Sequence, residues 1–98
     1  MNIKVLALVN GQEIIGQVTF SNGTYTVKEF AMVALVPSRE QGKMGYAIMP
    51  WMPYAEDDKV NISASHVLTE VTPRVDLINY YNQLFGSGIQ IASAGMLQ

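Results

Sequence analysis

The stretch "NGQEIIGQV", residues 10–18, places two glycines five positions apart between two apolar runs. Asn10-Gly11 is a strong signal for a tight hairpin turn, because both residue types tolerate a positive φ. Gly16 falls inside the second apolar run, where glycine costs backbone entropy and leaves nothing to pack. It therefore indicates a bulge, a sharp bend or the close approach of another strand.

The segments around this stretch predict three strands. Residues 3–9 are a continuous apolar run of strand length. Residues 14–20 alternate between apolar and polar side chains, which is typical of a half-buried antiparallel strand. After a second turn at "SNG", residues 24–36 predict a long strand with a kink near Glu29 and Phe30.

In residues 37–72 the apolar runs are interrupted by polar stretches and prolines. The polar residues 37–45 predict an exposed loop. A strand is expected from Tyr46, but Pro50 and Pro53 lack the N–H group that a sheet requires, so the far half of this strand lies at an edge or leaves the sheet. The acidic stretch "EDDK" predicts a solvated loop, and residues 66–72 predict a last short strand.

A helix is expected only near the end of the chain. Pro73 suits a helix start and Gly86 suits the position just past a helix end, so these signals bracket a helix over residues 74–86. Residues 87–98 are rich in small side chains and are expected to form a tail. The apolar residues that recur at helical spacing, and that should face the sheet, are Val75, Ile78, Tyr81 and Phe85, with Leu77 and Leu84 beside them.

These elements predict a mainly β fold: a small, strongly bent five-stranded antiparallel barrel over residues 1–73, with one C-terminal α-helix packed on it. In such a barrel one strand must bend enough to serve both halves, and a glycine inside a strand permits that curvature. We assign this role to Gly16.

The composition limits the class of protein. In a chain of 98 residues, 49% are apolar and only 14% are charged, which favours an oligomer that buries apolar surface between its subunits. A buried ligand or poor solubility would fit the same composition. With a net charge of −2 and six basic residues, strong binding of phosphates would require the basic residues to be concentrated. The lack of cysteine excludes disulfides and thiolate metal sites and fits a reducing cytosol. No apolar run approaches the roughly 18 residues of a membrane span.

Two motifs make the chain similar to the Sm fold, the family of Sm, Sm-like and bacterial Hfq proteins. The first motif is an apolar strand, a Gly, four residues and a second Gly before an alternating strand, and "VNGQEIIGQV" resembles it. The second is a closing strand that in Hfq contains a basic residue, His, a few small or apolar residues, Val and Pro. The stretch "SHVLTEVTP", residues 65–73, is similar, with His66 in the His position. "MPWMPYA" followed by "P-x-x-x-L-I-N-x-Y" resembles the small Sm-like proteins of phages and marine sequence collections, in which the helix follows the barrel.

The resemblance implies a homo-oligomeric ring of about five to seven subunits, closed by pairing the fourth strand of one subunit with the fifth strand of the next. It also implies that single-stranded RNA binds around the pore, through the loop between the second and third strands and the loop between the fourth and fifth strands. A phage origin would place the protein in the cytoplasm of a bacterial host. Tyr25 stands where the family has the Asn that reads the base, and Ser65 stands where Hfq has its basic residue. The usual uridine pocket is therefore not part of what the resemblance implies.

The candidate nucleic-acid contacts are His66, Tyr25, Asn22, Lys28 and Ser65. An imidazole such as that of His66 can stack on a base and donate to a phosphate or a base edge, or it can be an inert, hydrogen-bonded group at the start of a strand. Tyr25 can stack on a base, with Asn22 as an edge contact, or it can pack inside the barrel. Lys28 adds positive charge, which in or near a loop commonly serves solubility.

We expect a binding module and not an enzyme, because the sequence shows no nucleophile and base arrangement and no phosphate-cradling loop. No cofactor is expected, and no metal site, since the acidic stretch lacks the spacing of a calcium loop. The first hypothesis is an Sm-like ring that binds single-stranded nucleic acid, RNA more readily than DNA, in RNA or DNA processing or chaperoning. The alternative is a structural or protein-interaction ring without a nucleic-acid role, in which Trp51 and the C-terminal helix present the partner surface.

Overall fold

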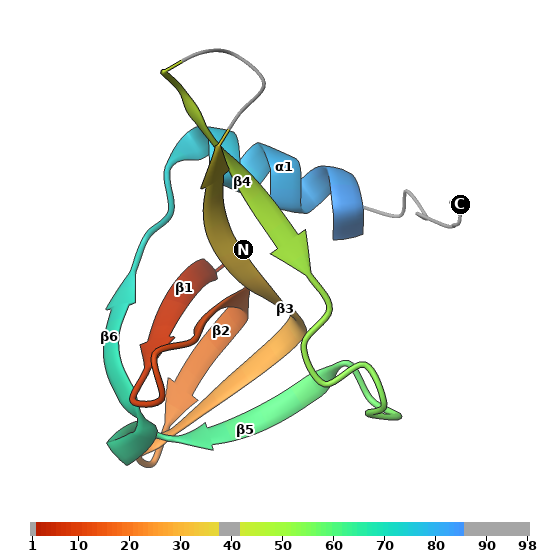
Figure 1. Cartoon of the computed structure of the whole chain (residues 1–98). Helices are drawn as coiled ribbons and strands as arrows, with labels where there is room; N and C mark the ends of the chain where they lie inside the picture. Colours follow the sequence, from red (N-terminus) through yellow and green to blue (C-terminus); the bar gives the residue numbers. More distant parts are fainter. Residues whose placement is uncertain (1, 38–41, 86–98) are drawn as a thin grey trace.

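One curved antiparallel sheet and one helix form the part of the chain that the computed structural model describes, residues 2–37 and 42–85 (Figure 1). The elements in chain order are β1 (Ile3–Leu8), β2 (Glu13–Ser21), β3 (Thr24–Pro37), β4 (Met44–Met49), β5 (Lys59–Ser63), the short 3₁₀ helix η1 (Ala64–His66), β6 (Val67–Val71) and α1 (Val75–Phe85). The strands pair in the order β4-β3-β2-β1-β6, and β5 also pairs with β3. The prediction of a mainly β protein with a C-terminal helix is confirmed.

The described chain contains six strands, whereas the sequence predicts five. The difference arises at β3, which pairs with β5 along its first part and with β4 along its last part. The loop between β4 and β5, residues 50–58, contains the two prolines that cannot donate to a ladder. The expected fourth strand is thus interrupted, and its continuation, β5, begins at the end of the "EDDK" stretch that predicts a loop.

A β-bulge in β3 lies where the sequence predicts a kink. The β2 residues on either side of Gly16 pair with β3 residues that are three positions apart, so Glu29 and Phe30 together face Gly16. Glu29 has a φ of 51°, in the left-handed region that non-glycine residues seldom occupy. The bulge separates the part of β3 that pairs with β5 from the part that pairs with β4.

Gly16 allows the bulged strand to lie against β2. A Cβ atom on this residue would be 2.5 Å from Cγ1 of Val27 and 2.9 Å from the carbonyl oxygen of Lys28. The second contact is with backbone, which cannot rotate away as a side chain can. The structure confirms the close approach at this glycine, and the bulge lies in β3 opposite it, so the strand that serves both halves of the sheet is β3 and not β2.

Hydrogen bonds of Glu29 connect the bulge to three other elements. Its N–H donates to the carbonyl of Asp58 at 2.8 Å, and its carbonyl accepts from the hydroxyl of Tyr81 on α1 at 2.6 Å. Its carboxylate accepts from the amide of Gln17 on β2 at 2.7 Å. Partial burial, and then the charge of Asp58, raises the pKa of the Glu29 carboxyl above its ordinary value.

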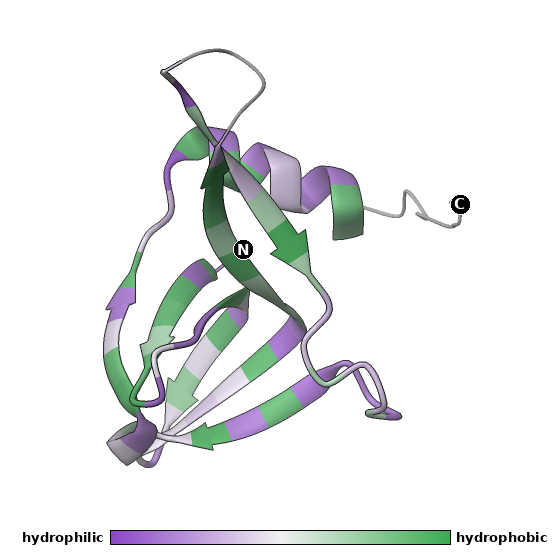
Figure 2. Cartoon of the chain, in the orientation of Figure 1, coloured by the Kyte–Doolittle hydropathy of each residue, from purple (hydrophilic) through white to green (hydrophobic). Residues whose placement is uncertain are grey.

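The sheet carries an apolar layer on each face, and Figure 2 shows strongly hydrophobic residues along the upper part of β3 and at the end of β4. This arrangement explains why the first strand is a continuous apolar run. The layer between α1 and the sheet is formed by residues of both elements: Ile3, Ile15, Ala31, Val33, Leu77 and Tyr81. The layer inside the curve of the sheet contains Leu6, Leu8, Ile14, Val18, Val27 and Phe30.

Helix α1 packs on the sheet through Leu77 and Tyr81, which are 6% and 1% exposed. The expectation that Val75 belongs to this face is wrong, because its side chain is 72% exposed. The helix begins one residue later than the predicted range of 74–86. Gly86 and the predicted tail lie outside the described residues.

The glycine in β2 gives a first prediction. We expect Gly16→Ala to lower the free energy of unfolding by about 2 kcal/mol or more, because the methyl group overlaps the backbone of β3. Urea unfolding followed by circular dichroism measures this loss. Gly23→Ala is the matched control: a Cβ there meets no atom within 4 Å, and only its φ of +75° should cost about 1 kcal/mol. A Gly16→Ala loss no larger than that of the control would contradict the close approach.

The hydroxyl that joins α1 to the bulge gives a second prediction. Tyr81→Phe leaves the ring in place but removes the donor to the Glu29 carbonyl, so we expect a loss of about 1–2 kcal/mol of stability. Tyr80→Phe, one position earlier on the same helix, is the control. It should change stability by less than about 0.5 kcal/mol, since the hydroxyl of this half-buried residue has no hydrogen-bond partner among the described residues. Thermal unfolding of both variants measures the difference, and equal stability of the two would exclude this hydrogen bond as a link.

Candidate nucleic-acid interface

Three turns meet at one end of the sheet. The N–H of Ala64 in η1 donates to the carbonyl of Gly23 at 2.9 Å, which holds η1 against the β2–β3 turn. The N–H of Val9 donates to the carbonyl of His66 at 3.0 Å, which holds η1 against the β1–β2 turn. Figure 1 shows η1 and the β2–β3 turn side by side at the bottom of the molecule. We call this end the turn surface; its residues are Asn22, Gly23, Ser65 and His66.

The local sequence fixes the backbone of this surface. Asn22 and Gly23 have φ values of 53° and 75°, and two consecutive positive values are typical of the type I′ turn that Asn-Gly favours. The hydroxyl of Ser63 accepts from the N–H of Ser65 at 3.3 Å and lies 3.0 Å from the Ser65 hydroxyl. Ser63 therefore caps η1, and the side chain of Asn22 remains exposed.

His66 is the last residue of η1 and directly precedes β6. Its backbone carbonyl is held by Val9, whereas its exposed imidazole forms no hydrogen bond or ion pair with the residues that the structure describes. Both ring nitrogens are thus accessible, and a backbone hydrogen bond fixes the position from which the ring projects.

Tyr25 lies on β3 next to this surface, but its ring is partly occupied by packing. It is half-buried, and its centroid is 4.7 Å from that of Phe20 on β2, with the ring planes tilted by 54°. Phe20 is 56% exposed, so it presents more aromatic surface to solvent than Tyr25 does. Sequence reasoning did not single out Phe20, although its position just before the "SNG" turn was available as a signal.

Lys28 is not part of the turn surface. It lies four residues along β3 from Thr24, a separation of about 13 Å in an extended strand. It pairs across the sheet with Lys59 of β5, and both side chains are exposed. The sequence prediction missed Lys59 as a neighbour because it did not include β5, although the alternation in "KVNIS" was a usable signal.

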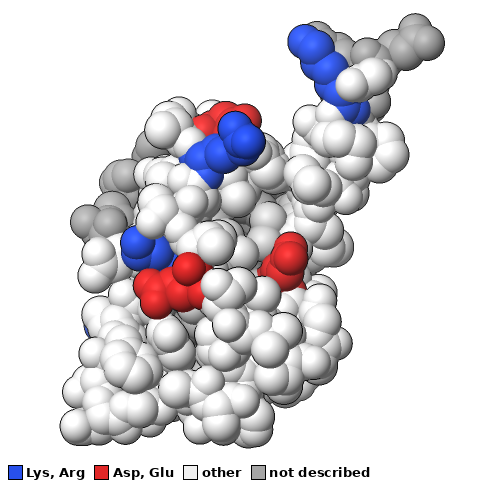
Figure 3. Space-filling model, turned by 90° about the vertical axis from the view of Figure 1, so that its left-hand side faces the viewer, with Lys and Arg blue, Asp and Glu red and all other residues white. Residues whose placement is uncertain are grey.

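The turn surface has little charge of its own. Figure 3 views the molecule from the side on which β6 lies in Figure 1, and the lowest part of this face shows no Lys, Arg, Asp or Glu. Figure 1 places η1 and the β2–β3 turn at that height. A ligand at this end of the face would therefore be held by ring stacking and by neutral hydrogen-bonding groups, with few direct contacts from lysine or arginine to phosphates.

Two other kinds of site were sought in the described ranges, residues 2–37 and 42–85. No group of three or more His, Asp or Glu side chains within them is placed to hold a metal ion. The same ranges contain no helix with the length and apolar character needed to cross a membrane.

No protein-family model matches the sequence of this chain, and no curated protein sequence matches it. What the protein binds is therefore inferred from its own residues and from the motifs that resemble the Sm family.

Proposed function

We propose that the chain adopts an Sm-like barrel, assembles as a homo-oligomeric ring, and binds single-stranded nucleic acid, RNA rather than DNA, at the turn surface. The observation that carries the proposal is the hydrogen bond from Ala64 to Gly23. It brings the loop after β2 together with the segment before the last strand, and His66 lies at their junction. These are the two regions through which the Sm resemblance implies RNA binding.

The edges of the sheet support the ring. In the described chain the sheet ends at β6 on one side and at β4 and β5 on the other. An unpaired strand edge readily pairs with another chain, and pairing of the β4 and β5 edge with β6 of the next subunit would remove both edges. Large apolar side chains on these strands are solvent-exposed: Met44 and Met49 on β4, and Leu68 and Val71 on β6.

The chemistry of the turn surface suits weak contacts that are repeated by symmetry. Each subunit would contribute one imidazole from His66, and Phe20 and Tyr25 would add aromatic faces on which bases can stack. The amide of Asn22 and the hydroxyl of Ser65 are neutral partners for base edges and for the 2′-hydroxyl groups of RNA. Several such contacts on one strand raise avidity without a basic subunit.

A protein-interaction ring is the second candidate. The lowest part of the face in Figure 3 shows no charged side chain, which favours this candidate, because most nucleic-acid sites obtain affinity from clustered lysine and arginine. The same barrel and the same ring would then serve assembly alone.

The ring yields a prediction about molecular mass. We expect wild-type protein to have a mass of about five to seven chains by light scattering after size-exclusion chromatography. Leu68→Lys places a charge on the β6 edge, where the side chain is 70% exposed in the isolated chain, and should yield monomers at concentrations at which wild type is a ring. Gln83→Lys, on an exposed position of α1, adds the same charge and should leave the ring intact. A wild-type protein that is monomeric throughout would exclude the ring.

The turn surface yields a prediction about binding. We expect labelled oligo-U, oligo-A or mixed single-stranded DNA to bind with a Kd of about 10 µM or tighter by fluorescence anisotropy, with RNA binding more tightly. His66→Ala should weaken binding by about fivefold or more, while Gln83→Ala should bind as wild type does. Because lysine and arginine contribute little here, affinity should fall only shallowly with salt. If none of the three oligonucleotides binds even at low salt to protein that forms rings, the nucleic-acid role is wrong and the protein-interaction ring remains.

A further inference from the structure

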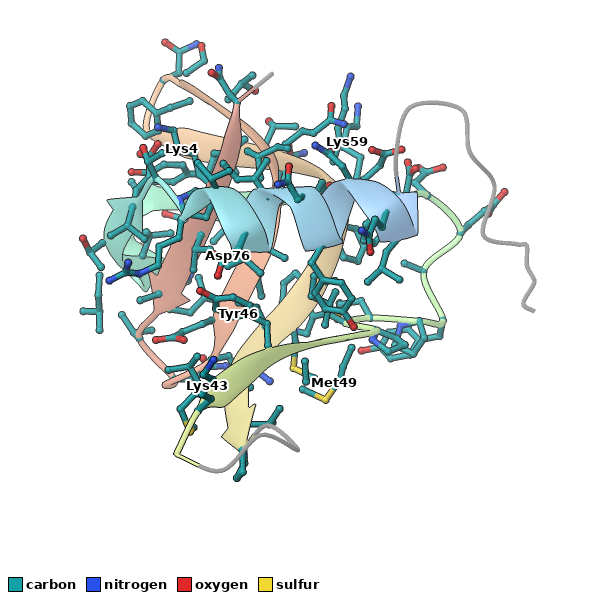
Figure 4. The ribbon with its side chains drawn as sticks, turned by 90° about the horizontal axis from the view of Figure 1, so that it is seen from above. Lys4, Lys43, Tyr46, Met49, Lys59 and Asp76 are labelled. Carbon is teal, nitrogen blue, oxygen red and sulfur yellow. The ribbon has the colours of Figure 1, made fainter. Side chains whose placement is uncertain are left out.

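A second candidate site lies away from the turn surface. An open cavity of about 400 Å³ is lined by the end of β4, the loop of residues 50–58 and the last turn of α1. Met49, labelled in Figure 4, lies where β4 leads into this loop. The volume falls in the range of about 300–1,000 Å³ that is usual for small-molecule sites.

Aromatic rings and thioethers form the walls. The rings of Phe30 and Trp51 meet edge to face, with centroids 5.4 Å apart and planes at 85°. Phe85 of α1 contributes a third ring, and Met49 and Met52 contribute polarisable sulfur atoms. Trp51 is only partly buried and lines the cavity, and a cation within about 6 Å of a tryptophan ring is attracted to its face.

Part of the cavity lining is acidic. Glu56, Asp57 and Asp58 line the cavity, whereas no lysine or arginine does. These three carboxylates are exposed and form no ion pair with any residue in the described part of the chain. They are also not arranged as a metal-binding group. Their charge therefore favours a cation whose apolar body fills the aromatic part of the cavity.

The backbone of the loop is held in an unfavourable conformation. Met52 has a φ of 57°, although it is neither a glycine nor part of an Asn-Gly turn. The N–H of Ala55 donates to the Met52 carbonyl at 3.0 Å, which helps to hold the loop in this shape. Conformations of this kind cluster at ligand clamps, where the surrounding structure enforces them.

We propose that this cavity binds an organic cation, an ammonium group that carries methyl or methylene substituents. The apolar substituents would contact Trp51, Phe30 and the methionines, and the charge would lie toward Asp57 and Asp58. The site is separate from the turn surface and does not depend on the proposed binding of nucleic acid.

Trp51 provides the measurement, because it is the only tryptophan in the chain. We would titrate the full-length protein with choline and, in parallel, with 3,3-dimethylbutan-1-ol, a neutral molecule of nearly the same shape. Choline should change Trp51 fluorescence saturably with a Kd of about 1 mM or tighter, and the neutral alcohol should bind at least about fivefold more weakly. Equal affinity for the two molecules would show that the cavity binds apolar molecules without regard to charge, which contradicts the proposal. The lack of a saturable signal with choline would also overturn it.

Matched variants locate the charge. Asp57→Asn combined with Asp58→Asn removes two charges from the cavity lining and leaves the Asp58 backbone carbonyl that accepts from the Glu29 N–H. It should weaken choline binding by about fivefold or more. Glu70→Gln combined with Asp76→Asn removes two exposed charges that do not line the cavity, and should leave binding unchanged. Equal effects of the two pairs would show that only the net charge of the protein matters and would contradict this site.

A variant of Trp51 tests the aromatic contact. Trp51→Leu keeps an apolar side chain in the cavity wall but removes the ring. If calorimetry shows that this variant binds choline as wild type does, an aromatic contact is excluded.

Discussion

The bulge of Glu29 and Phe30 against Gly16 is the constraint on which the rest of this structure depends. Two residues of β3 occupy the space opposite one residue of β2, and this is sterically possible only because that residue has no side chain. The extra residue bends β3, which lets one strand pair with β5 before the bulge and with β4 after it. A small sheet can in this way curve enough to enclose an apolar interior.

The bulge also determines the positions of the segments that form the two candidate sites. The helix is joined to it through the Tyr81 hydroxyl, and the loop that leads to β5 is joined to it through the Asp58 carbonyl. The aromatic cavity lies between that helix and that loop. At the opposite end, the pairing of β5 with the first part of β3 brings η1 to the β2–β3 turn. The two candidate sites are thus products of one bend in one strand.

The candidate nucleic-acid site was only partly predictable. The sequence indicated His66 and Asn22, because a lone imidazole and an Asn-Gly turn are visible without knowing the fold. The sequence did not indicate that Phe20 packs against Tyr25 and is the more exposed of the two, since exposure depends on where the sheet ends. The sequence prediction also grouped Lys28 with these residues. In the structure Lys28 lies opposite Lys59 in the pairing of β3 with β5, and the sequence prediction did not contain this pairing.

The sequence by itself determined the elements with strong local signals: the turns at Asn10-Gly11 and Asn22-Gly23, the long third strand with its kink, and the C-terminal helix. These follow from local φ preferences and from the period of apolar residues, which act within a few positions of the chain. Only the tertiary structure decided that Gly16 needs to lack a side chain because of β3, that the fourth strand divides in two, and that Val75 faces solvent. Each of these depends on contacts between residues far apart in the chain, and the spacing of residues along one segment carries no record of which distant segment will lie beside it.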